Sequence, residues 1–287
     1  MFTSQNKKVK YANQFIWFEK WVIGRRTIHQ LSQESKCSIR SLKRLLKIYL
    51  NTNPKLTIRP SQKTNLLIDG TYFSNGICLI VYRDAKVKYT QFYRITNGEH
   101  FTEIREDLGN LIKLGLQIES VTCDGHKAML KAIRYALPNT LIQRCIVHIQ
   151  RDCRIWLTQN PKSEAGVELK RIVSKLHLIK TQNDKVFWLN AFDYWYEKYS
   201  EYINEKSFNP ETERYWYKHK MVRRSYSTIK RALPNMFYYL ENKEIPKSTN
   251  SIESFFGHLK NNLNIHRGLS YENRKQFLKW YLYFKNS

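Results

Sequence analysis

The sequence lacks any long apolar segment. It holds no run of about 18 or more apolar residues, the length that crosses a bilayer as a helix, and its N-terminus shows no signal-peptide pattern. Both absences argue against an integral membrane protein and against a secreted one. We therefore expect a cytoplasmic protein with no membrane partner.

Cysteines are few and show no paired spacing. The five, Cys37, Cys78, Cys123, Cys145 and Cys153, are odd in number and scattered along the chain. This pattern provides neither a disulfide framework nor a zinc ribbon made of paired Cys-x-x-Cys motifs. It favours a reducing compartment.

Acidic residues are also scarce. The chain has 24 Asp and Glu against 49 Lys and Arg, which gives a formal net charge of +25 and a pI of about 9.8. Such an excess indicates a polyanionic partner, for which nucleic acid is the leading candidate. The excess is densest in residues 1–62, with 13 basic and 2 acidic residues, whereas residues 63–287 hold 36 and 22.

Three short helices are predicted in the N-terminal segment. Apolar residues between Phe15 and Val22 indicate the first helix, a capping box of Thr27 and Gln30 begins the second, and Ser38 caps the third. This spacing is typical of a helix-turn-helix, so residues 1–62 are predicted to be an all-α DNA-binding module and linker.

The third of these helices presents a basic face. The polar residues that avoid its apolar stripe are Arg40, Ser41, Lys43, Arg44 and Lys47. On a recognition helix these side chains would read a groove or contact phosphates. The alternative is a small three-helix bundle whose basic face is only solvated.

From residue 63 the periodicity changes to alternating strands and helices. Strands are predicted over 66–73, 77–82, 87–95, 118–123 and 141–144, and helices over 101–114, 126–137 and 146–158. The order βββαβαβα is that of an α/β ribonuclease H-like core. We assign residues 63–158 to the first part of this core, 159–245 to a helical insertion, and 246–287 to the C-terminal part.

Asp69 lies in the first predicted strand, where aspartate is unusual. Asp-Gly is a frequent hairpin turn, but Asn75-Gly76 is the better turn here. An aspartate in a strand is costly to bury, and a divalent cation would compensate for that cost. Asp69 is therefore a candidate metal ligand, with the hairpin turn as the alternative.

Asp124 ends the fourth predicted strand and precedes a helix. Its alternative role is the N-cap of that helix. In the predicted sheet the first and fourth strands are neighbours, so Asp69 and Asp124 can converge. Two carboxylates at such a short distance repel each other unless cations neutralise them. Mg²⁺ prefers such oxygen ligands.

Two further motifs carry candidate residues. Glu253 begins a helix whose buried side includes Phe255 and Phe256, although it could also be the partner of Asn250 in a capping box. Cys145 and His148 follow the fifth strand as Cys-x-x-His; by themselves they could equally be a buried cysteine and an ordinary helix histidine.

Together these motifs resemble the DDE transposases of the Mutator-like superfamily and their bacterial insertion-sequence relatives. The matching residues are Asp69 in Ile-Asp-Gly-Thr, Asp124 in Cys-Asp-Gly-His, Cys145 and His148 in Cys-Ile-Val-His, and Glu253 in Thr-Asn-Ser-Ile-Glu-Ser-Phe-Phe. The resemblance covers roughly residues 63–287, and four motifs in this order on this strand pattern are specific.

The resemblance implies a DNA transposase with a ribonuclease H-like core. Asp69, Asp124 and Glu253 are then the catalytic residues that bind two Mg²⁺ or Mn²⁺ ions, and Cys145 and His148 are auxiliary residues near the active site. The implied partners are double-stranded DNA, as terminal inverted repeats and as target, and a second copy in a homodimer. In a bacterium, the protein would be associated with the nucleoid.

Aromatic residues in the predicted insertion have two expected roles. Those near helical spacing are expected in a core: Phe187, Ala191, Tyr194, Trp195 and Tyr199. Trp216 is followed by basic residues that suit stacking on unpaired bases and phosphate contact: Lys220, Arg223 and Arg224.

Two other functions stay open. One is a ribonuclease H-like nuclease without strand transfer, and the other is a catalytically silent, domesticated DNA-binding derivative. The presence of all three acids argues against the silent protein. The helix-turn-helix pattern favours recognition of specific DNA ends.

Overall fold

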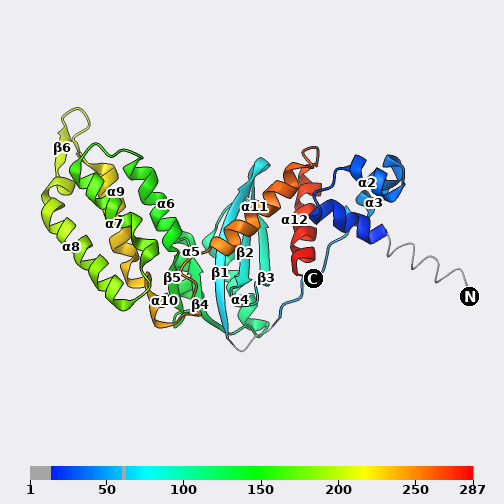
Figure 1. Ribbon diagram of the computed structural model, residues 1–287, viewed down its shortest axis with the longest axis horizontal. Helices are drawn as coiled ribbons and strands as arrows, with labels where there is room; N and C mark the ends of the chain where they lie inside the picture. Colours follow the sequence, from blue (N-terminus) through cyan, green and yellow to red (C-terminus); the bar gives the residue numbers. More distant parts are fainter. Residues whose placement is uncertain (1–13, 60–62, 287) are drawn as a thin grey trace, which may run out of the picture. The chain divides into compact units, whose positions relative to one another are not determined.

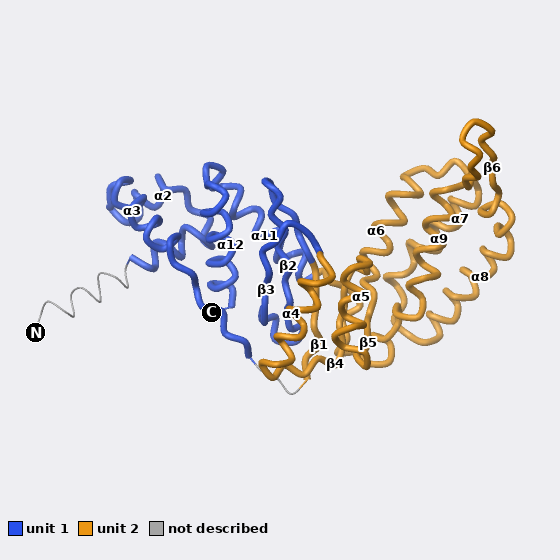
Figure 2. Tube along the Cα trace, turned by 180° about the vertical axis from the view of Figure 1, so that it is seen from behind, with its two compact units in different colours: residues 1–60, 70–99, 251–287 blue, residues 61–69, 100–250 orange. Residues whose placement is uncertain are grey.

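The computed structural model describes residues 14–59 and 63–286 (Figure 1). Residues 1–13 and 60–62 of the predicted N-terminal module lie outside the described residues. The chain forms two compact units, which Figure 2 shows in different colours. The first unit contains residues 1–60, 70–99 and 251–287, and the second contains residues 61–69 and 100–250.

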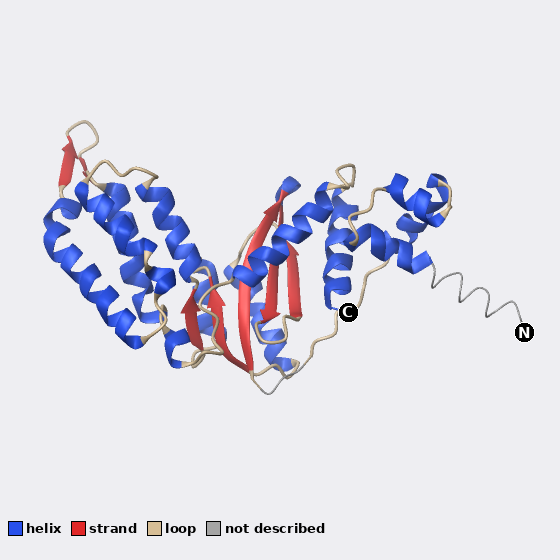
Figure 3. Cartoon of the chain, in the orientation of Figure 1, coloured by secondary structure: helices blue, strands red, loops and turns tan. Residues whose placement is uncertain are grey.

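A five-stranded mixed sheet has the strand order β3-β2-β1-β4-β5 (Figure 3). Its strands are β1 (Thr64–Phe73), β2 (Ile77–Asp84), β3 (Thr90–Thr96), β4 (Ile118–Cys123) and β5 (Leu141–Arg144). β1 and β5 both pair with β4 in parallel, and β2 pairs with β3 in antiparallel. All five predicted strands are present, and the mixed α/β architecture is consistent with a ribonuclease H-like fold.

Within the first unit, the described chain starts in a helix over 14–23, followed by α2 (Ile28–Ser35) and α3 (Ile39–Leu50). The predicted caps are present. Thr27 and Gln30 form the capping box of α2, and the Ser38 side chain accepts a hydrogen bond from the backbone N–H of Ser41. The sequence therefore determines where these helices begin through local side-chain bonds.

Aromatic side chains join the start of this unit to its end. α11 (Asn250–Asn264) and α12 (Tyr271–Asn286) are the last two helices. Trp280 of α12 packs on Phe18, with ring centroids 5.2 Å apart, and its indole N–H donates to the carbonyl of Tyr49 at 2.9 Å. Residues at opposite ends of the sequence therefore share one core in this unit.

The second unit holds β4, β5 and a helical region. Its helices are α4 (Phe101–Lys113), α5 (Lys127–Ala136), α6 (Ile146–Leu157), α7 (Glu164–Ser174), α8 (Gln182–Asn204), α9 (Lys220–Ala232) and α10 (Tyr238–Glu241). Buried side chains from α6 to α9 form one hydrophobic core. Within it, Trp188 and Trp195 of α8 donate indole hydrogen bonds to carbonyls of α7, at 2.8 and 2.9 Å.

The helical-spacing prediction for α8 was only partly right. Trp195 and Tyr199 are buried as expected, whereas Phe187 and Tyr194 are 74% and 67% exposed. The buried stripe of α8 includes Trp188 and Phe192 instead. Large aromatic residues occur on both sides of this helix, so spacing alone did not identify the buried face.

Residues 159–245, which we predicted to be a helical insertion, also contain two short strands. A two-stranded hairpin of β6 (Lys206–Asn209) and β7 (Arg214–Tyr217) lies between α8 and α9 (Figure 3). The strands are four residues long and largely exposed, so they carry no apolar alternation that would predict them. Asn209 begins the turn, with its side-chain oxygen accepting the backbone N–H of Glu211 at 2.8 Å.

Over the described residues, no helix combines the length and the hydropathy needed to cross a lipid bilayer.

Candidate active site

The parallel strands bring three motif residues to one edge of the sheet. Ile68 of β1 pairs with Cys123 of β4, which in turn pairs with Arg144 of β5. The residues that follow these three are Asp69, Asp124 and Cys145. The predicted adjacency of the first and fourth strands is therefore confirmed, and the carboxyl ends of parallel strands are where α/β sheets bind ligands.

Asp69 lies inside β1 and is only 5% exposed. The chain turns later, at Asn75 and Gly76, whose φ angles of 65° and 70° are left-handed. The alternative of an Asp-Gly hairpin turn at Asp69 is thus wrong. A carboxylate at this depth is costly unless hydrogen bonds or a cation compensate for the lost water.

Asp124 follows β4 and is half-buried. Its Oδ1 accepts the backbone N–H of His126 at 2.8 Å. The N-cap of α5 is His126, not Asp124, and the side chain of His126 makes no capping hydrogen bond. Asp124 therefore stabilises the turn before α5 with one oxygen and is not the N-cap that the alternative proposed.

Cys145 and His148 connect this edge to the segment before α11. Thr249 donates to the Cys145 sulfur from its backbone N–H at 3.3 Å, and its hydroxyl lies 3.5 Å from that sulfur and 3.4 Å from Nδ1 of His148. The backbone N–H of Ile146 also donates to the carbonyl of Lys247 at 3.0 Å. The Cys-x-x-His motif therefore fixes the chain immediately upstream of Glu253.

The ionisation of Cys145 and His148 is coupled. Burial by itself lowers the pKa of His148, but its hydrogen bond to the Cys145 sulfur and the negative charges of Cys145, Asp69 and Asp124 outweigh burial and raise the pKa to about 9. Burial opposes ionisation of Cys145, yet the contact with His148 and the hydrogen bonds from Thr249 lower its pKa. The nearby acids thus favour the protonated form of His148 as long as no cation is bound.

Glu253 lies in the first turn of α11, which begins at Asn250. Asn250 is therefore inside the helix and not the residue before it, as the capping-box alternative required. Glu253 belongs to the first unit, whereas Asp69, Asp124 and His148 belong to the second. The second unit thus brings two carboxylates and an imidazole together as a candidate metal site, because the charges of Asp69 and Asp124 both act on His148.

The donor set fits a divalent cation. Two carboxylates suit Mg²⁺ or Mn²⁺, which prefer oxygen ligands. An imidazole binds metal only when neutral, which the raised pKa of His148 opposes. Within the second unit these two carboxylates are those of buried Asp69 and half-buried Asp124, whose charges both act on His148.

The predicted DNA-contact residues occupy exposed surfaces. On α3 all five are exposed: Arg40, Ser41, Lys43, Arg44 and Lys47. Trp216 is 50% exposed on the hairpin, and Lys220 is exposed at the start of α9. Arg223 covers the ring of Tyr217 at 3.7 Å, and Arg224 covers that of Trp156 at 4.4 Å.

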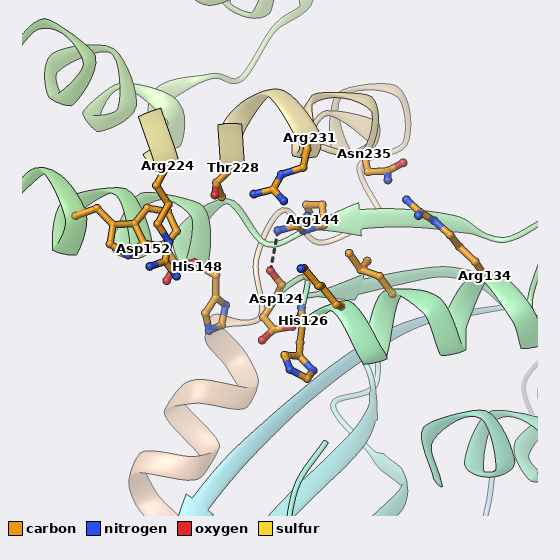
Figure 4. Close-up of a pocket in the computed structure, with 14 residues that line it drawn as sticks. Asp124, His126, Arg134, Arg144, His148, Asp152, Arg224, Thr228, Arg231 and Asn235 are labelled. Carbon is orange, nitrogen blue, oxygen red and sulfur yellow. Dashed lines mark hydrogen bonds between the residues drawn. The ribbon is translucent and has the colours of Figure 1, made fainter. Parts of the chain in front are cut away.

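The prediction from sequence missed several residues around Asp124. Arg144, Asp152, Thr228 and Arg231 line a cavity together with Asp124 and His148 (Figure 4). Two signals were available: Arg144 directly precedes the Cys-x-x-His motif, and the polar residues 224, 228 and 231 recur at helical spacing.

The chain matches a known protein family. The model of the family described as "Transposase, Mutator family" matches residues 92–269. No curated protein matches the chain. The matched segment includes Asp124, Cys145, His148 and Glu253, and it begins after Asp69. Because it covers more than half of the sequence, the chain belongs to the Mutator family of transposases.

Proposed function

We propose that the chain is a DDE-type DNA transposase that cuts DNA at transposon ends and joins the freed ends to target DNA. Membership of the Mutator family supports this reaction class. The observation that carries the proposal is the pair of acids Asp69 and Asp124 beside His148 at the strand edge of the second unit. Two acids that would otherwise repel each other indicate a cation-dependent site.

In this proposal Asp69, Asp124 and Glu253 hold the catalytic Mg²⁺ or Mn²⁺, two ions in all. The bound cations would stabilise charge on the phosphoryl oxygens and on the attacking and leaving oxygens. His148 is a positioning residue: its positive charge offsets the acids, and its contact with Thr249 fixes the approach to α11.

The reaction consists of two displacements at phosphorus in the same site. In the first, water attacks the phosphodiester at the transposon end, and the P–O3′ bond breaks to leave a 3′-hydroxyl. In the second, that hydroxyl attacks a target phosphodiester, and a new P–O bond replaces the one that breaks. Both steps are in-line, so one set of side chains serves both.

DNA recognition is assigned to two surfaces. The exposed basic face of α3 would read the terminal inverted repeat as the second helix of a helix-turn-helix. Trp216 with Lys220, Arg223 and Arg224 would contact unpaired bases and phosphates near the cut. We expect a homodimer, because two transposon ends must be processed together.

The test uses a DNA that carries the element's terminal repeats, Mg²⁺ and a target plasmid. Nicking and strand transfer are scored for the native chain, for Asp69→Asn and for the control Asp193→Asn. Asp193 is an exposed carboxylate of α8 in the same unit. Asp193→Asn therefore changes the net charge by the same amount as Asp69→Asn without altering the site. Circular dichroism and a binding assay confirm that each variant folds and binds DNA.

We expect nicking and joining by the native chain and by Asp193→Asn, and neither by Asp69→Asn. Binding by the native chain without nicking would favour the alternative of a catalytically silent DNA-binding protein. Nicking without joining would favour the alternative of a ribonuclease H-like nuclease. Nicking by Asp69→Asn at the native rate would show that the site lies elsewhere.

A further inference from the structure

A cavity of about 570 Å³ opens beside Asp124 within the second unit. Its walls come from the start of α5, the end of β5, α6 and α9 (Figure 4). This volume lies in the range of small-molecule sites and exceeds what the metal ligands need. The cavity is therefore too large to serve only as part of a metal site.

The lining of the cavity is strongly basic. Five of the lining side chains are lysine or arginine, namely Lys127, Arg134, Arg144, Arg224 and Arg231, whereas only Asp124 and Asp152 are acidic. Asp124 is already assigned to cations, and Asp152 is half-buried at the α6 wall. The remaining positive charge calls for an anionic ligand.

Arg144 lies at the back of the cavity. Its Nη2 donates to the carbonyl of Asp124 at 3.2 Å, and its guanidinium packs so closely on Gly125 that a Cβ there would overlap it. Its Nε is buried and has no hydrogen-bond partner within the described part of the chain. A buried donor without an acceptor is costly, and an oxyanion in the cavity would supply one.

Arg231 faces Arg144 from the opposite wall. In Figure 4 its side chain reaches from α9 toward the Arg144 guanidinium. Burial lowers the pKa of Arg144, and the positive charge of Arg231 acts in the same direction. Two guanidinium groups that repel each other across a cavity are stabilised when an anion binds to both.

α9 and α5 complete an anion-binding arrangement. Arg224, Thr228 and Arg231 are spaced by four and three residues, so they share one face of α9. The N-terminus of the ten-residue helix α5 lines the cavity through His126 and Lys127. Helix N-termini favour anions, and phosphate is the anion whose oxygens match the fork of arginine.

We propose that this cavity binds a backbone phosphate of the DNA strand next to the phosphate that is cut, held by Arg144 and Arg231. The inference rests on the proposed function, since it places the substrate relative to Asp124. It adds two substrate-positioning residues outside the acidic motifs. It also explains why a basic face of the helical region adjoins the strand edge.

The experiment measures DNA binding without catalysis, in EDTA, while neutral methylphosphonates replace single phosphates around the cut site one at a time. Native protein, Arg231→Gln, Arg144→Lys and the control Arg171→Gln are compared. Arg171 is an exposed arginine of α7 in the same unit and does not line this cavity. Arg144→Lys keeps the charge but loses the fork that binds two oxygens.

We expect one methylphosphonate next to the cut site to weaken native binding about tenfold, as for a lost charge-assisted hydrogen bond. Arg231→Gln should bind unmodified DNA about tenfold more weakly and should no longer respond to that methylphosphonate. Arg144→Lys should show a smaller loss, and Arg171→Gln should behave as native.

The proposal is overturned if Arg231→Gln stays as sensitive as native protein to every methylphosphonate, or if Arg171→Gln loses as much affinity. If Arg144→Lys does not fold, Arg231→Gln alone decides. Because binding is measured without catalysis, failure of the phosphate site can be distinguished from failure of the proposed reaction. A chain that shows this coupling but never cuts keeps the phosphate site and loses the transposase proposal, whereas one that cuts and joins without the coupling loses only the phosphate site.

Discussion

The two sides of the candidate active site are constructed differently. On the acidic side, Asp69 and Asp124 follow paired residues of adjacent parallel strands, so the sheet register determines their positions. On the basic side, Arg224 and Arg231 extend from one exposed face of α9. This construction suits a site in which the rigid sheet edge would hold the proposed cations, whereas the long side chains of α9 can adjust to a polymeric anion.

The largest expected effect concerns the acidic side and separates Asp124 from His148. Asp124→Asn should lower nicking at least about 100-fold and weaken Mn²⁺ binding, because it removes a proposed metal ligand. His148→Gln should lower nicking about 10- to 100-fold, as for a residue that positions ligands. Isothermal titration with Mn²⁺ and single-turnover nicking measure both. Reversed magnitudes would make His148 the ligand and Asp124 the supporting residue.

Thr249 supports the acidic side, and its loss should have the next largest effect. Thr249→Val removes the hydroxyl contacts with Cys145 and His148 but keeps the backbone hydrogen bond. We expect about a tenfold loss of nicking, with DNA affinity unchanged. Thr249→Ser retains the hydroxyl and serves as the matched control. Equal rates for native protein and the valine variant would exclude a positioning role for this residue.

Substitutions on the two basic surfaces should have smaller effects on DNA binding, and the two effects should differ in kind. Replacing Arg40 and Lys43 on α3 with Gln should reduce the preference for terminal repeats over random DNA, because α3 is proposed to read bases. Arg231→Gln should weaken binding to both DNAs equally. It should also lower the slope of log K for DNA binding against log salt concentration by about 0.9 per lost phosphate contact. Binding isotherms at several salt concentrations distinguish the two. A uniform loss for the α3 variant would argue against base reading.

The smallest effect should come from His266, a histidine of the first unit. Burial lowers the pKa of His266, and its Nε2 lies 3.0 Å from the carbonyl of Trp21. A depressed pKa means that folding favours the neutral ring, so its stabilising contribution is full above the unfolded pKa of about 6.5 and falls as the pH drops below it. Native protein should therefore melt at a lower temperature at about pH 5 than at about pH 7.5.

His266→Gln should reduce this pH dependence of the melting temperature without changing nicking at neutral pH. A matched variant of exposed His29 should melt like native protein at both pH values. If the pH dependence is the same with and without His266, its burial does not control acid stability.

How much the sequence predicted depended on whether a pattern is local. Thr27 and Ser38 cap helices through bonds to residues three positions away, and β2 has an unbroken apolar run from Ile77 to Tyr82, so these elements were predictable. The adjacency of Asp69 and Asp124 joins residues that are far apart in the sequence. It was predictable because the expected strand order makes β1 and β4 neighbours, and parallel neighbours end at one edge.

Other features depend on residues far apart in the sequence. Arg144 and Arg231 are 87 positions apart and meet only because α9 returns to the end of β5. Trp280 shares a core with Phe18, although the sequence suggested a separate N-terminal module. The hairpin of β6 and β7 is too short and too exposed to show a strand pattern. In each case tertiary packing determines the outcome.

The central claim is that Asp69 holds a catalytic divalent cation, and an exchange of ligand chemistry tests it most directly. Asp69→Cys replaces a carboxylate with a thiolate, which binds Mg²⁺ poorly and softer cations better. Nicking of terminal-repeat DNA is measured in Mg²⁺ and in Mn²⁺, with native protein alongside. The account predicts no nicking by Asp69→Cys in Mg²⁺ and partial recovery in Mn²⁺. Native-like nicking by Asp69→Cys in Mg²⁺ would contradict it.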